Sequence, residues 1–344
     1  MGFCLRHQKH TRCWGRGGNK SHGRPCSAVA PDSGAGINRI ATRHRAFFHL
    51  RVQDLIAKAA TLLEALPYIQ RFSGATFVVK YGGSFMDSPD PTVRNGVARD
   101  IVFLEAVEIN PVVVHGGGKA ITRAMDAAGL KANFIQGMRV TDEAAVRIVD
   151  EVLSREINPE VVAAINSFGG AAKGFSGADI FTCRKLWLED KHQPGAKVDI
   201  GYVGEVVGVN TEPLMDCIAR GITPVISPTA RGEDGKIYNC NADVAAAQVA
   251  IALKARRLVF MSDVPGLLSD PKNPDSVVSH LKIAAVRGLK DSGVIDKGMI
   301  PKVDSAVTAI KSGVEKVSFV DGRVPHAVLL EIFTDEGLGT EVVL

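Results

Sequence analysis

The sequence lacks the features that mark several common protein classes. It has no apolar run near the roughly 20 residues that cross a bilayer, so we expect no membrane span. Neither the P-loop pattern GxxxxGK(S/T) nor the dinucleotide pattern GxGxxG occurs in the sequence. The sequence therefore gives no support for a P-loop or a Rossmann nucleotide-binding fold. Aromatic residues make up 6% of the chain, and no aromatic stacking pattern accompanies the basic residues, which disfavours a nucleic-acid binder.

The spacing of the cysteines matches no common disulfide-exchange or metal-binding motif. The three cysteines beyond residue 50 form no CxxC pair, which is typical of reduced thiols in a cytosol-like compartment. Cys4 and Cys13, with two histidines between them, match no common zinc-finger spacing. We therefore expect no metal ion held by protein ligands alone.

Positive charge is concentrated at the start of the chain. The net charge is +4, but residues 1–50 hold nine Lys or Arg and one acidic residue, Asp32. The remaining 294 residues hold 32 of the 41 basic and 36 of the 37 acidic residues, a net charge of −4. We predict a disordered or processed basic leader over residues 1–50. A bacterial cytoplasm is the expected compartment, with a plastid as the alternative if the leader is a transit peptide.

Residues 51–72 are predicted to form a separate amphipathic helix. Apolar side chains between Val52 and Leu66 recur at helical spacing and give the helix one apolar face. Pro67 is expected to kink or end this helix, because proline removes a backbone donor. The apolar face requires a partner, either its own domain or another subunit.

Strand and helix patterns alternate from residue 76 onward. Strands are predicted within 76–83, 111–118, 178–184, 202–210, 221–228, 257–266 and 315–322. Helices are predicted within 91–109, 119–129, 142–168, 241–255, 300–313 and 324–333. This alternation predicts an α/β fold, a three-layer αβα sandwich with a mostly parallel central sheet. Ligands of such sheets bind beyond the carboxyl ends of the strands.

Two glycine clusters follow predicted strands. FVVK ends at Lys80 and precedes Gly82 and Gly83, and PVVV precedes His115 and the three glycines 116–118. Bare backbone before a helix offers free N–H groups and the positive end of the helix dipole. We therefore predict a phosphate or carboxylate against these glycines. Lys80 taken alone is more often a lysine that extends its stem along a sheet edge, and the second glycine cluster shifts the interpretation toward a ligand site.

Six segments occur in a diagnostic order: KYGGS, VHGGGKAI, QGMRVT, YNCNAD, SDVPGLL and GMIPK. Together they resemble the amino acid kinase family, and within it the members that phosphorylate N-acetyl-L-glutamate. The resemblance covers residues 75–344. The segments LLEALPYIQRF and DGRVPHAVLLEIFTDEGLGTEV resemble the arginine-inhibited, hexameric subgroup.

The resemblance implies a reaction. ATP and N-acetyl-L-glutamate would give ADP and N-acetyl-L-glutamyl 5-phosphate, the second step of arginine biosynthesis, with Mg²⁺ bound to the ATP phosphates. A carboxylate nucleophile with a pKa of about 4.3 needs no base at neutral pH, and the chain offers no HRD-like base motif. The resemblance assigns residues 73–250 to an N-acetylglutamate-binding lobe and 251–344 to an ATP-binding lobe.

The catalytic roles implied by the resemblance fall on two lysines and one aspartate. Lys80 and Lys302 would neutralise the transferred phosphoryl group from two sides, and Asp243 would orient both lysines. Arg139 would bind the α-carboxylate of the substrate with its two-pronged guanidinium, and Asn239 its acetamido or carboxylate region. Backbone N–H groups would come from Gly82, Gly83, Gly117 and Gly118. The nucleoside site would comprise Asp263, Val264, Gly266, Leu267, Val294, Ile295 and Asp296.

Simpler roles remain open for these polar residues. Asp243 or Asn241 fits the N-cap of the helix within 241–255. Arg139 fits a surface ion pair, and Asn239 fits an ordinary loop. Lys302 would lie in the first turn of a helix, where the dipole disfavours a cation unless an anion is near.

The resemblance to the subgroup also implies regulation. Arginine would bind as an inhibitor near Tyr68, Glu331 and Gly337 in the C-terminal part of the ATP-binding lobe. Ser318 stands where the subgroup has a histidine, which puts the affinity for arginine in doubt. The helix 51–72 would join three dimers into a hexamer. A PII nitrogen-signalling protein is a candidate partner, and nucleic acid and membrane are not. The alternative functions are another carboxylate or carbamate kinase of this fold, or a non-catalytic regulatory homologue.

Overall fold

The computed structural model describes residues 34–190, 193, 195–296 and 298–344. The chain divides into two compact units at Ala59 and Ala60, and the second unit contains the sheet and all the candidate site residues. Residues 1–33 of the predicted leader, with the Cys4–Cys13 segment, lie outside the described residues, whereas residues 34–50 belong to a helix and are not disordered as predicted. Within the described residues, no helix is both long enough and apolar enough to cross a bilayer.

Helix α1 spans Gly34–Phe72 and contains Pro67. The prediction that Pro67 could end the helix is wrong, because α1 continues for one more turn beyond it. The side chains of that turn explain this: Phe72 is 1% exposed, and Tyr68 packs against the same core cluster. Their burial outweighs the backbone hydrogen bond that proline removes. Leucines 55, 62 and 63 on α1 remain exposed.

An eight-stranded sheet forms the centre of the second unit. All of its described neighbouring strands are parallel except β13 and β14, which are antiparallel. In spatial order the strands are β12 (His280–Lys282), β14 (Thr340–Val343), β13 (Lys316–Asp321), β11 (Arg257–Ser262), β1 (Thr76–Tyr81), β2 (Asn110–His115), β8 (Thr223–Ile226) and β5 (Ala172–Phe175).

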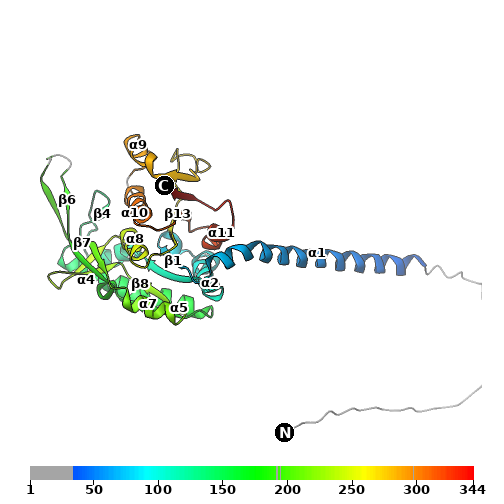
Figure 1. Cartoon of the computed structure of the whole chain (residues 1–344). Coiled ribbons are helices and arrows are strands. Elements are labelled where there is room, and N and C mark those ends of the chain that lie inside the picture. Colours follow the sequence, from blue (N-terminus) through cyan, green and yellow to red (C-terminus); the bar gives the residue numbers. More distant parts are fainter. Residues whose placement is uncertain (1–33, 191–192, 194, 297) are drawn as a thin grey trace, which may run out of the picture. The chain divides into compact units, whose positions relative to one another are not determined.

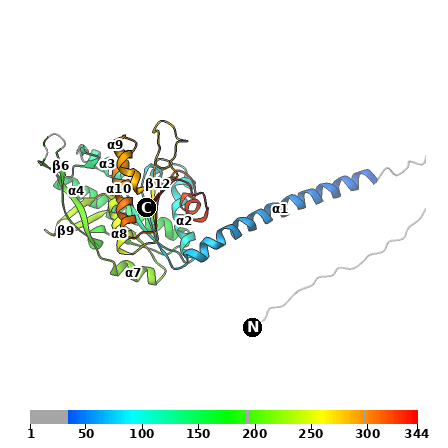
Figure 2. The same cartoon turned by 45° about the horizontal axis from the view of Figure 1, so that its top comes forward.

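Helices cover both faces of this sheet, as Figures 1 and 2 show. Alternate side chains of β1 enter opposite cores: Val78 packs with α8 and α10, whereas Phe77 and Val79 pack with α2 and α11. This confirms the predicted three-layer sandwich and its mostly parallel sheet. The first face carries α8 (Ala242–Ala252), α9 (Val286–Asp291), α10 (Met299–Lys311) and the short η3 (Ile283–Ala285). The second carries α2 (Pro91–Ala106), α3 (Gly118–Ala127) and α11 (Ala327–Phe333).

The helix predicted over 142–168 is interrupted. It consists of α4 (Glu143–Asp150), a π-helical segment η2 (Glu151–Ile157) and α5 (Asn158–Ser167). Asp142 caps α4 by accepting a hydrogen bond from the Ala145 N–H at 2.8 Å. The π turn inserts an extra residue per turn, which apolar periodicity does not reveal.

A small closed barrel lies beside the main sheet. Its strands are β10 (Ile237–Cys240), β7 (Lys197–Val209), β6 (Phe181–Glu189) and β9 (Thr229–Gly232). Strand β6 begins later than predicted, because residues 177–180 form the helical turn α6 (Gly177–Ile180). Strands β5, β9, β10, β12 and β14 were not predicted, since each is four residues long or shorter. The remaining elements are η1 (Ser84–Asp87), α7 (Glu212–Ala219) and the hairpin of β3 (Phe134–Ile135) with β4 (Met138–Arg139).

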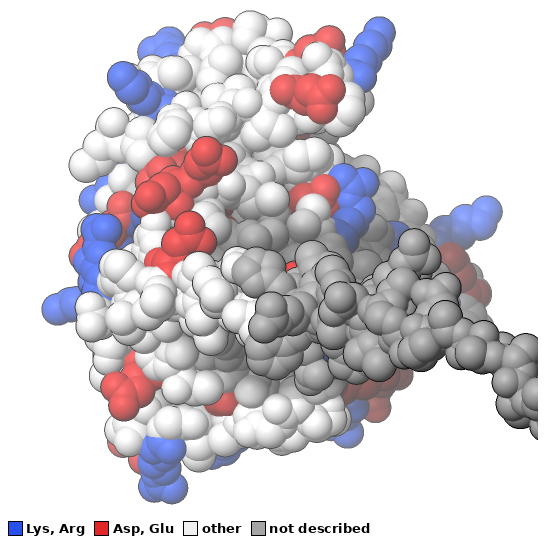
Figure 3. Space-filling model, turned by 90° about the vertical axis from the view of Figure 1, so that its right-hand side faces the viewer, with Lys and Arg blue, Asp and Glu red and all other residues white. Residues whose placement is uncertain are grey.

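The predicted boundary between two lobes at residue 250 lies inside α8. Strand β1 pairs with β2 of the first predicted lobe and with β11 of the second, so one sheet serves both. The assignment of N-acetylglutamate to residues 73–250 and of ATP to residues 251–344 thus remains a prediction. On the face shown in Figure 3, the described Lys and Arg side chains are scattered among Asp and Glu side chains and do not merge into one patch.

Candidate active site

Lys80, Asp243 and Lys302 converge on one point although they come from three elements. Lys80 is near the carboxyl end of β1, and Asp243 and Lys302 lie in the first turns of α8 and α10. The Lys80 Nζ lies 3.1 Å from Asp243 Oδ1, and the Lys302 Nζ lies 2.8 Å from Asp243 Oδ2. The three side chains are 85% or more buried. Lys80 is thus not an exposed edge lysine.

The cap of α8 is Asn241 and not Asp243. The Asn241 side chain accepts hydrogen bonds from the backbone N–H groups of Asp243 at 2.8 Å and Val244 at 3.3 Å. An asparagine at this position satisfies the free donors of the first turn. The Asp243 carboxylate is therefore available to the two lysines.

The two ammonium groups of the cluster favour the ionised form of Asp243. Burial alone would raise the pKa of Asp243, but the ammonium groups of Lys80 and Lys302 outweigh it and lower that pKa to about 2. Burial lowers the pKa of Lys80, and Asp243 opposes this effect. Two ammonium groups and one carboxylate leave a net positive charge in a buried site. Such a site favours an anionic ligand.

The glycine turns are packed too tightly for side chains. A Cβ on Gly82 would lie 3.0 Å from the Gly116 nitrogen and 3.1 Å from Lys80 Nζ. A Cβ on Gly117 would lie 2.4 Å from Ile157 Cδ1 and 2.7 Å from Leu153 Cδ2. The turn therefore approaches both the lysine and the π-helical segment, and helix α3 starts directly after it with free N–H groups.

A cleft of about 600 Å³ contains most of the predicted site residues. Lys80, Lys302 and Asp243 line it together with Gly82, Gly83, Gly117, Gly118, Arg139, Asn239, Asp263 and Val264. Its volume suits a small-molecule ligand. The catalytic, substrate-binding and first nucleoside residues predicted from the sequence thus share one cleft.

Five predicted nucleoside residues do not line this cleft. Leu267 and Ile295 are 1% exposed and belong to the core, and a Cβ on Gly266 would lie 2.6 Å from Thr340 Oγ1. Val294 packs against the same core, and the Asp296 carbonyl accepts from the Met299 N–H. These residues shape the neighbouring segment, and their contact with a nucleoside remains a prediction.

Arg139 is buried at the edge of the cleft and not in a surface ion pair. Its Nη2 donates to the Gly118 carbonyl at 3.0 Å and to Thr122 Oγ1 at 2.8 Å. Its guanidinium carbon lies 4.7 Å from the centre of the Phe134 ring. Asn239 Nδ2 donates to Thr141 Oγ1 at 3.3 Å. The guanidinium is therefore oriented beside the glycine turn, where it can bind a carboxylate.

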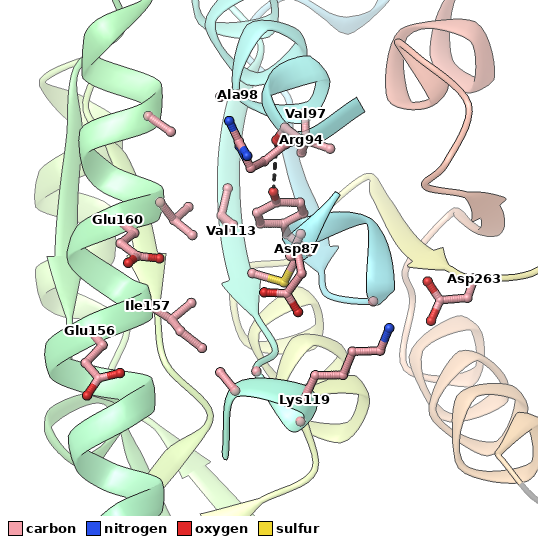
Figure 4. A pocket seen from close by; sticks show the side chains of 18 of the residues that line it. Asp87, Arg94, Val97, Ala98, Val113, Lys119, Glu156, Ile157, Glu160 and Asp263 are labelled. Atoms are coloured by element: carbon pink, nitrogen blue, oxygen red, sulfur yellow. Dashed lines mark hydrogen bonds between the residues drawn. The ribbon is translucent and has the colours of Figure 1, made fainter. Parts of the chain in front are cut away.

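A second cavity of about 900 Å³ lies behind the glycine turn and was not predicted (Figure 4). Val97 and Val113 form part of its apolar floor, whereas Lys119, Glu156 and Glu160 supply charge at its margin. It shares with the smaller cleft the residues Gly83, Gly117, Gly118, Phe134, Arg139 and Asp263. No single sequence motif signals it, because its walls combine residues of η1, α2, α3, η2 and α5 with residues of several strands.

The residues predicted for arginine lie close together near the end of the chain. Glu331 is 3% exposed and accepts hydrogen bonds from Ser318 Oγ at 2.7 Å and from the Leu338 N–H at 2.9 Å. A Cβ on Gly337 would lie 2.8 Å from Glu331 Oε2. Tyr68 reaches the same segment by donating its hydroxyl to Asp335.

Comparison with known proteins identifies the family. The model of the amino acid kinase family matches residues 75–321. The chain belongs to the amino acid kinase family. This confirms the family predicted from the six ordered segments. The subgroup with arginine inhibition and a hexameric assembly remains a prediction.

Curated relatives within the family are similar over nearly their whole length. The chain is 48% identical over 295 residues to an acetylglutamate kinase of Geobacter sulfurreducens, covering 85% of this chain and 99% of that protein. It is 46% identical over 289 residues to an acetylglutamate kinase of Thermoanaerobacter sp., covering 84% and 94%.

Solved structures of other proteins align with this chain. N-acetylglutamate synthase from Neisseria gonorrhoeae, complexed with coenzyme A and N-acetyl-glutamate, aligns with a TM-score of 0.72 at 26% identity over 83% of this chain. The alignment spans 63% of that synthase. Carbamate kinase from Giardia lamblia bound to AMP-PNP aligns with a TM-score of 0.54 at 15% identity, over 78% of this chain and 98% of that one, which supports the fold alone.

Proposed function

We propose that this chain transfers the terminal phosphoryl group of ATP to the side-chain carboxylate of N-acetyl-L-glutamate. The products are ADP and N-acetyl-L-glutamyl 5-phosphate. Relatives that are 46–48% identical carry the name acetylglutamate kinase, which supports this acceptor. The observation that carries the proposal is the convergence of Lys80 and Lys302 on Asp243 beside two bare glycine turns.

The chemistry requires charge stabilisation more than proton transfer. The acceptor carboxylate is ionised at neutral pH, since its ordinary pKa is about 4.3. It must approach a triphosphate, and negative charge spreads over the oxygens of the transferred group. Lys80 and Lys302 offer ammonium donors, and Gly82 and Gly117 offer backbone N–H groups. Donors fixed in advance stabilise such a transition state without reorganising.

Arg139 and Asn239 would hold the acceptor. The guanidinium lies next to Gly118, so a bound α-carboxylate would sit beside the phosphoryl site. Its two parallel N–H groups match two carboxylate oxygens. Asn239 lines the same cleft and can donate or accept through its amide, which suits the acetamido group. Both residues thereby orient the nucleophile.

Mg²⁺ fits this site as a partner of the nucleotide. Within the described residues, no group of three or more His, Cys, Asp or Glu side chains is arranged to hold a metal ion. Both Asp243 oxygens already contact ammonium groups. We therefore expect Mg²⁺ to enter bound to the ATP phosphates, where it neutralises charge on them. Asp263 and Val264, two of the residues predicted to bind the nucleoside, line the cleft.

The proposal is tested by trapping the acyl phosphate. The full chain is incubated with Mg·ATP and N-acetyl-L-glutamate, and hydroxylamine converts the product to a coloured hydroxamate. Parallel reactions use aspartate and carbamate as acceptors. Product with N-acetyl-L-glutamate alone is expected. Faster turnover with another acceptor would favour a different kinase of this fold, and no turnover with any acceptor would favour a non-catalytic homologue.

We also propose that arginine inhibits the enzyme at the Tyr68, Glu331 and Gly337 segment. Glu331 is a buried carboxylate, but Ser318 and the Leu338 N–H already bond to it, and Lys316 Nζ lies 3.4 Å away. An arginine ligand must compete with that lysine, so we expect weak inhibition. The acyl phosphate assay is repeated with rising arginine. Activity that stays constant to millimolar arginine contradicts inhibition and leaves the kinase assignment intact.

A further inference from the structure

His115 occupies a fully buried position between the glycine turn and helix α5. It is the last residue of β2, and no role in the reaction has been given to it above. Its Nδ1 lies 3.0 Å from the Gly116 carbonyl oxygen. Its Nε2 lies 3.2 Å from the side-chain nitrogen of Asn158, the first residue after the π-helical segment. Each ring nitrogen therefore has one polar neighbour.

The surroundings determine which ring nitrogen carries hydrogen. Asn158 Nδ2 also lies 3.0 Å from the Val225 carbonyl and 3.4 Å from the Phe175 carbonyl. Carbonyl oxygens only accept, so these contacts fix the amide with its nitrogen toward β8 and β5. An amide nitrogen only donates, so the contact with His115 Nε2 is a hydrogen bond only if Nε2 accepts. The single ring hydrogen then lies on Nδ1 and is donated to the Gly116 carbonyl. Burial lowers the pKa of His115 to about 4, which agrees with a neutral ring.

The backbone of Gly116 is thereby held at both of its polar groups. Its N–H donates to the Tyr81 carbonyl at 2.7 Å, and its carbonyl accepts from His115. In a trans peptide, the carbonyl of one residue and the N–H of the next point in opposite directions. Fixing the Gly116 carbonyl toward His115 therefore directs the Gly117 N–H away from His115. Gly117 lines the cleft that contains Lys80 and Lys302.

We propose that His115 is a positioning residue for phosphoryl transfer. Its Nδ1–H anchors the Gly116 carbonyl so that the Gly117 N–H faces the transferred group, and Asn158 fixes the ring in the tautomer that can do so. The residue acts through the backbone and touches no substrate. The inference rests on the proposed kinase function, because it assigns the Gly117 N–H to phosphoryl transfer.

Two replacements separate the functions of the two ring nitrogens. Asparagine places its amide nitrogen close to the position of Nδ1, so His115→Asn keeps the donor to Gly116. Glutamine places its terminal amide close to the position of Nε2, so His115→Gln keeps a partner for Asn158 and loses that donor. We expect kcat to fall about 10²-fold in His115→Gln, the cost of a misplaced group, and tenfold or less in His115→Asn. KM for ATP should change about threefold or less in both, because the donor acts in the transition state.

The tautomer is measured on the unmodified full chain. Long-range ¹H–¹⁵N spectra of ¹⁵N-histidine protein, with the His115 signals assigned by their loss in His115→Asn, should give a neutral ring protonated at Nδ1. A hydrogen on Nε2 would overturn the inference. Equal loss of kcat in the Asn and Gln variants at equal unfolding midpoints would also overturn it. If the wild-type chain makes no acyl phosphate, the proposed function fails, while the spectrum still reports the tautomer.

Discussion

At the scale of single residues, the chemistry of the site depends on which lysine each carboxylate oxygen of Asp243 contacts. Lys302 contacts both oxygens, at 2.9 and 2.8 Å, and Lys80 contacts one of them. Lys80 Nζ also lies 3.4 Å from the Gly82 carbonyl. Each ammonium group has three hydrogens, so each retains one for a ligand. The carboxylate fixes the direction of two flexible side chains. This explains why an acidic residue is useful in a site for anions.

Removing either lysine should slow the chemical step. We expect Lys80→Ala and Lys302→Ala each to lower kcat by on the order of 10²–10³, the effect of losing one transition-state donor. Lys185→Ala is a matched control, because Lys185 pairs with Asp199 and lines neither cavity. The acyl phosphate assay gives kcat for all three. Turnover near that of the control in both site variants would remove these lysines from the reaction.

The charge of Lys80 should also limit activity at high pH. Burial lowers the pKa of Lys80 from its ordinary value of 10.5, and the ammonium is present only below that pKa. As pH rises through the lowered pKa, the charge is lost and kcat should fall, at a lower pH than for an exposed lysine. The measurement is kcat against pH in the wild type and in Lys80→Arg, whose guanidinium stays charged. An identical alkaline fall in both proteins would assign it to another group.

At the scale of elements, the π-helical segment sets the position of the glycine turn. Leu153 and Ile157 of η2 occupy the volume that a side chain at Gly117 would need, whereas Gly118 has nothing within 4 Å. Both neighbours are buried, so they have little room to move. The turn therefore lies between η2 on one side and Lys80 on the other.

This packing predicts different effects on stability for two adjacent glycines. Gly117→Ala should lower the free energy of unfolding by about 1–3 kcal/mol, the usual effect of overpacking a core. Gly118→Ala should not lower it, because the position is open and alanine favours a helix start. Denaturant unfolding of both variants measures the difference. Equal stability of the two would show that η2 shifts freely and does not hold the turn.

The sequence predicts those parts of the fold that carry strong local patterns. Strands such as β1 and β2 were found because their buried residues form continuous apolar runs followed by glycines. The short strands β9 and β10 were missed, since each gains its stability from closing the barrel with β6 and β7 and not from local pattern. The break of the helix at Glu151 was missed because a π turn keeps a helical apolar face.

The residues of the candidate site could not be grouped from local sequence patterns alone. Lys80 and Lys302 were assigned through the resemblance of their segments, because residues so far apart in sequence cannot be paired from local chemistry. The sequence left Asn241 and Asp243 as alternative caps, and only the backbone geometry decides between them. His115 was visible beside the three glycines, but its role depends on Asn158, which no motif connects to it.

At the scale of the whole molecule, helix α1 exposes large apolar side chains to solvent. Leu62 and Leu63 are 68% and 67% exposed in the single chain. We proposed from the sequence that this helix joins dimers into a hexamer, and an exposed leucine pair is what such an interface would bury. Pairing of these faces between subunits would leave the kinase cleft of the second unit unchanged.

The assembly is tested by changing that surface alone. Replacing Leu62 and Leu63 with glutamine should convert a hexamer to dimers that still form acyl phosphate. Lys58→Gln, an exposed position on the same helix, serves as the control. Sedimentation or light scattering gives the mass of each variant. A hexamer that survives both leucine replacements, or a wild-type chain that is never larger than a dimer, contradicts the proposed interface.

The most direct test of the central claim is a crystal structure with Mg·ADP, N-acetyl-L-glutamate and aluminium fluoride, which mimics the transferred phosphoryl group. We predict that the Nζ atoms of Lys80 and Lys302 lie at hydrogen-bond distance, ~3 Å, from different fluorides, with Asp243 between the lysines. A fluoride group bound away from both lysines, with the cleft at Gly117 empty, would contradict the account.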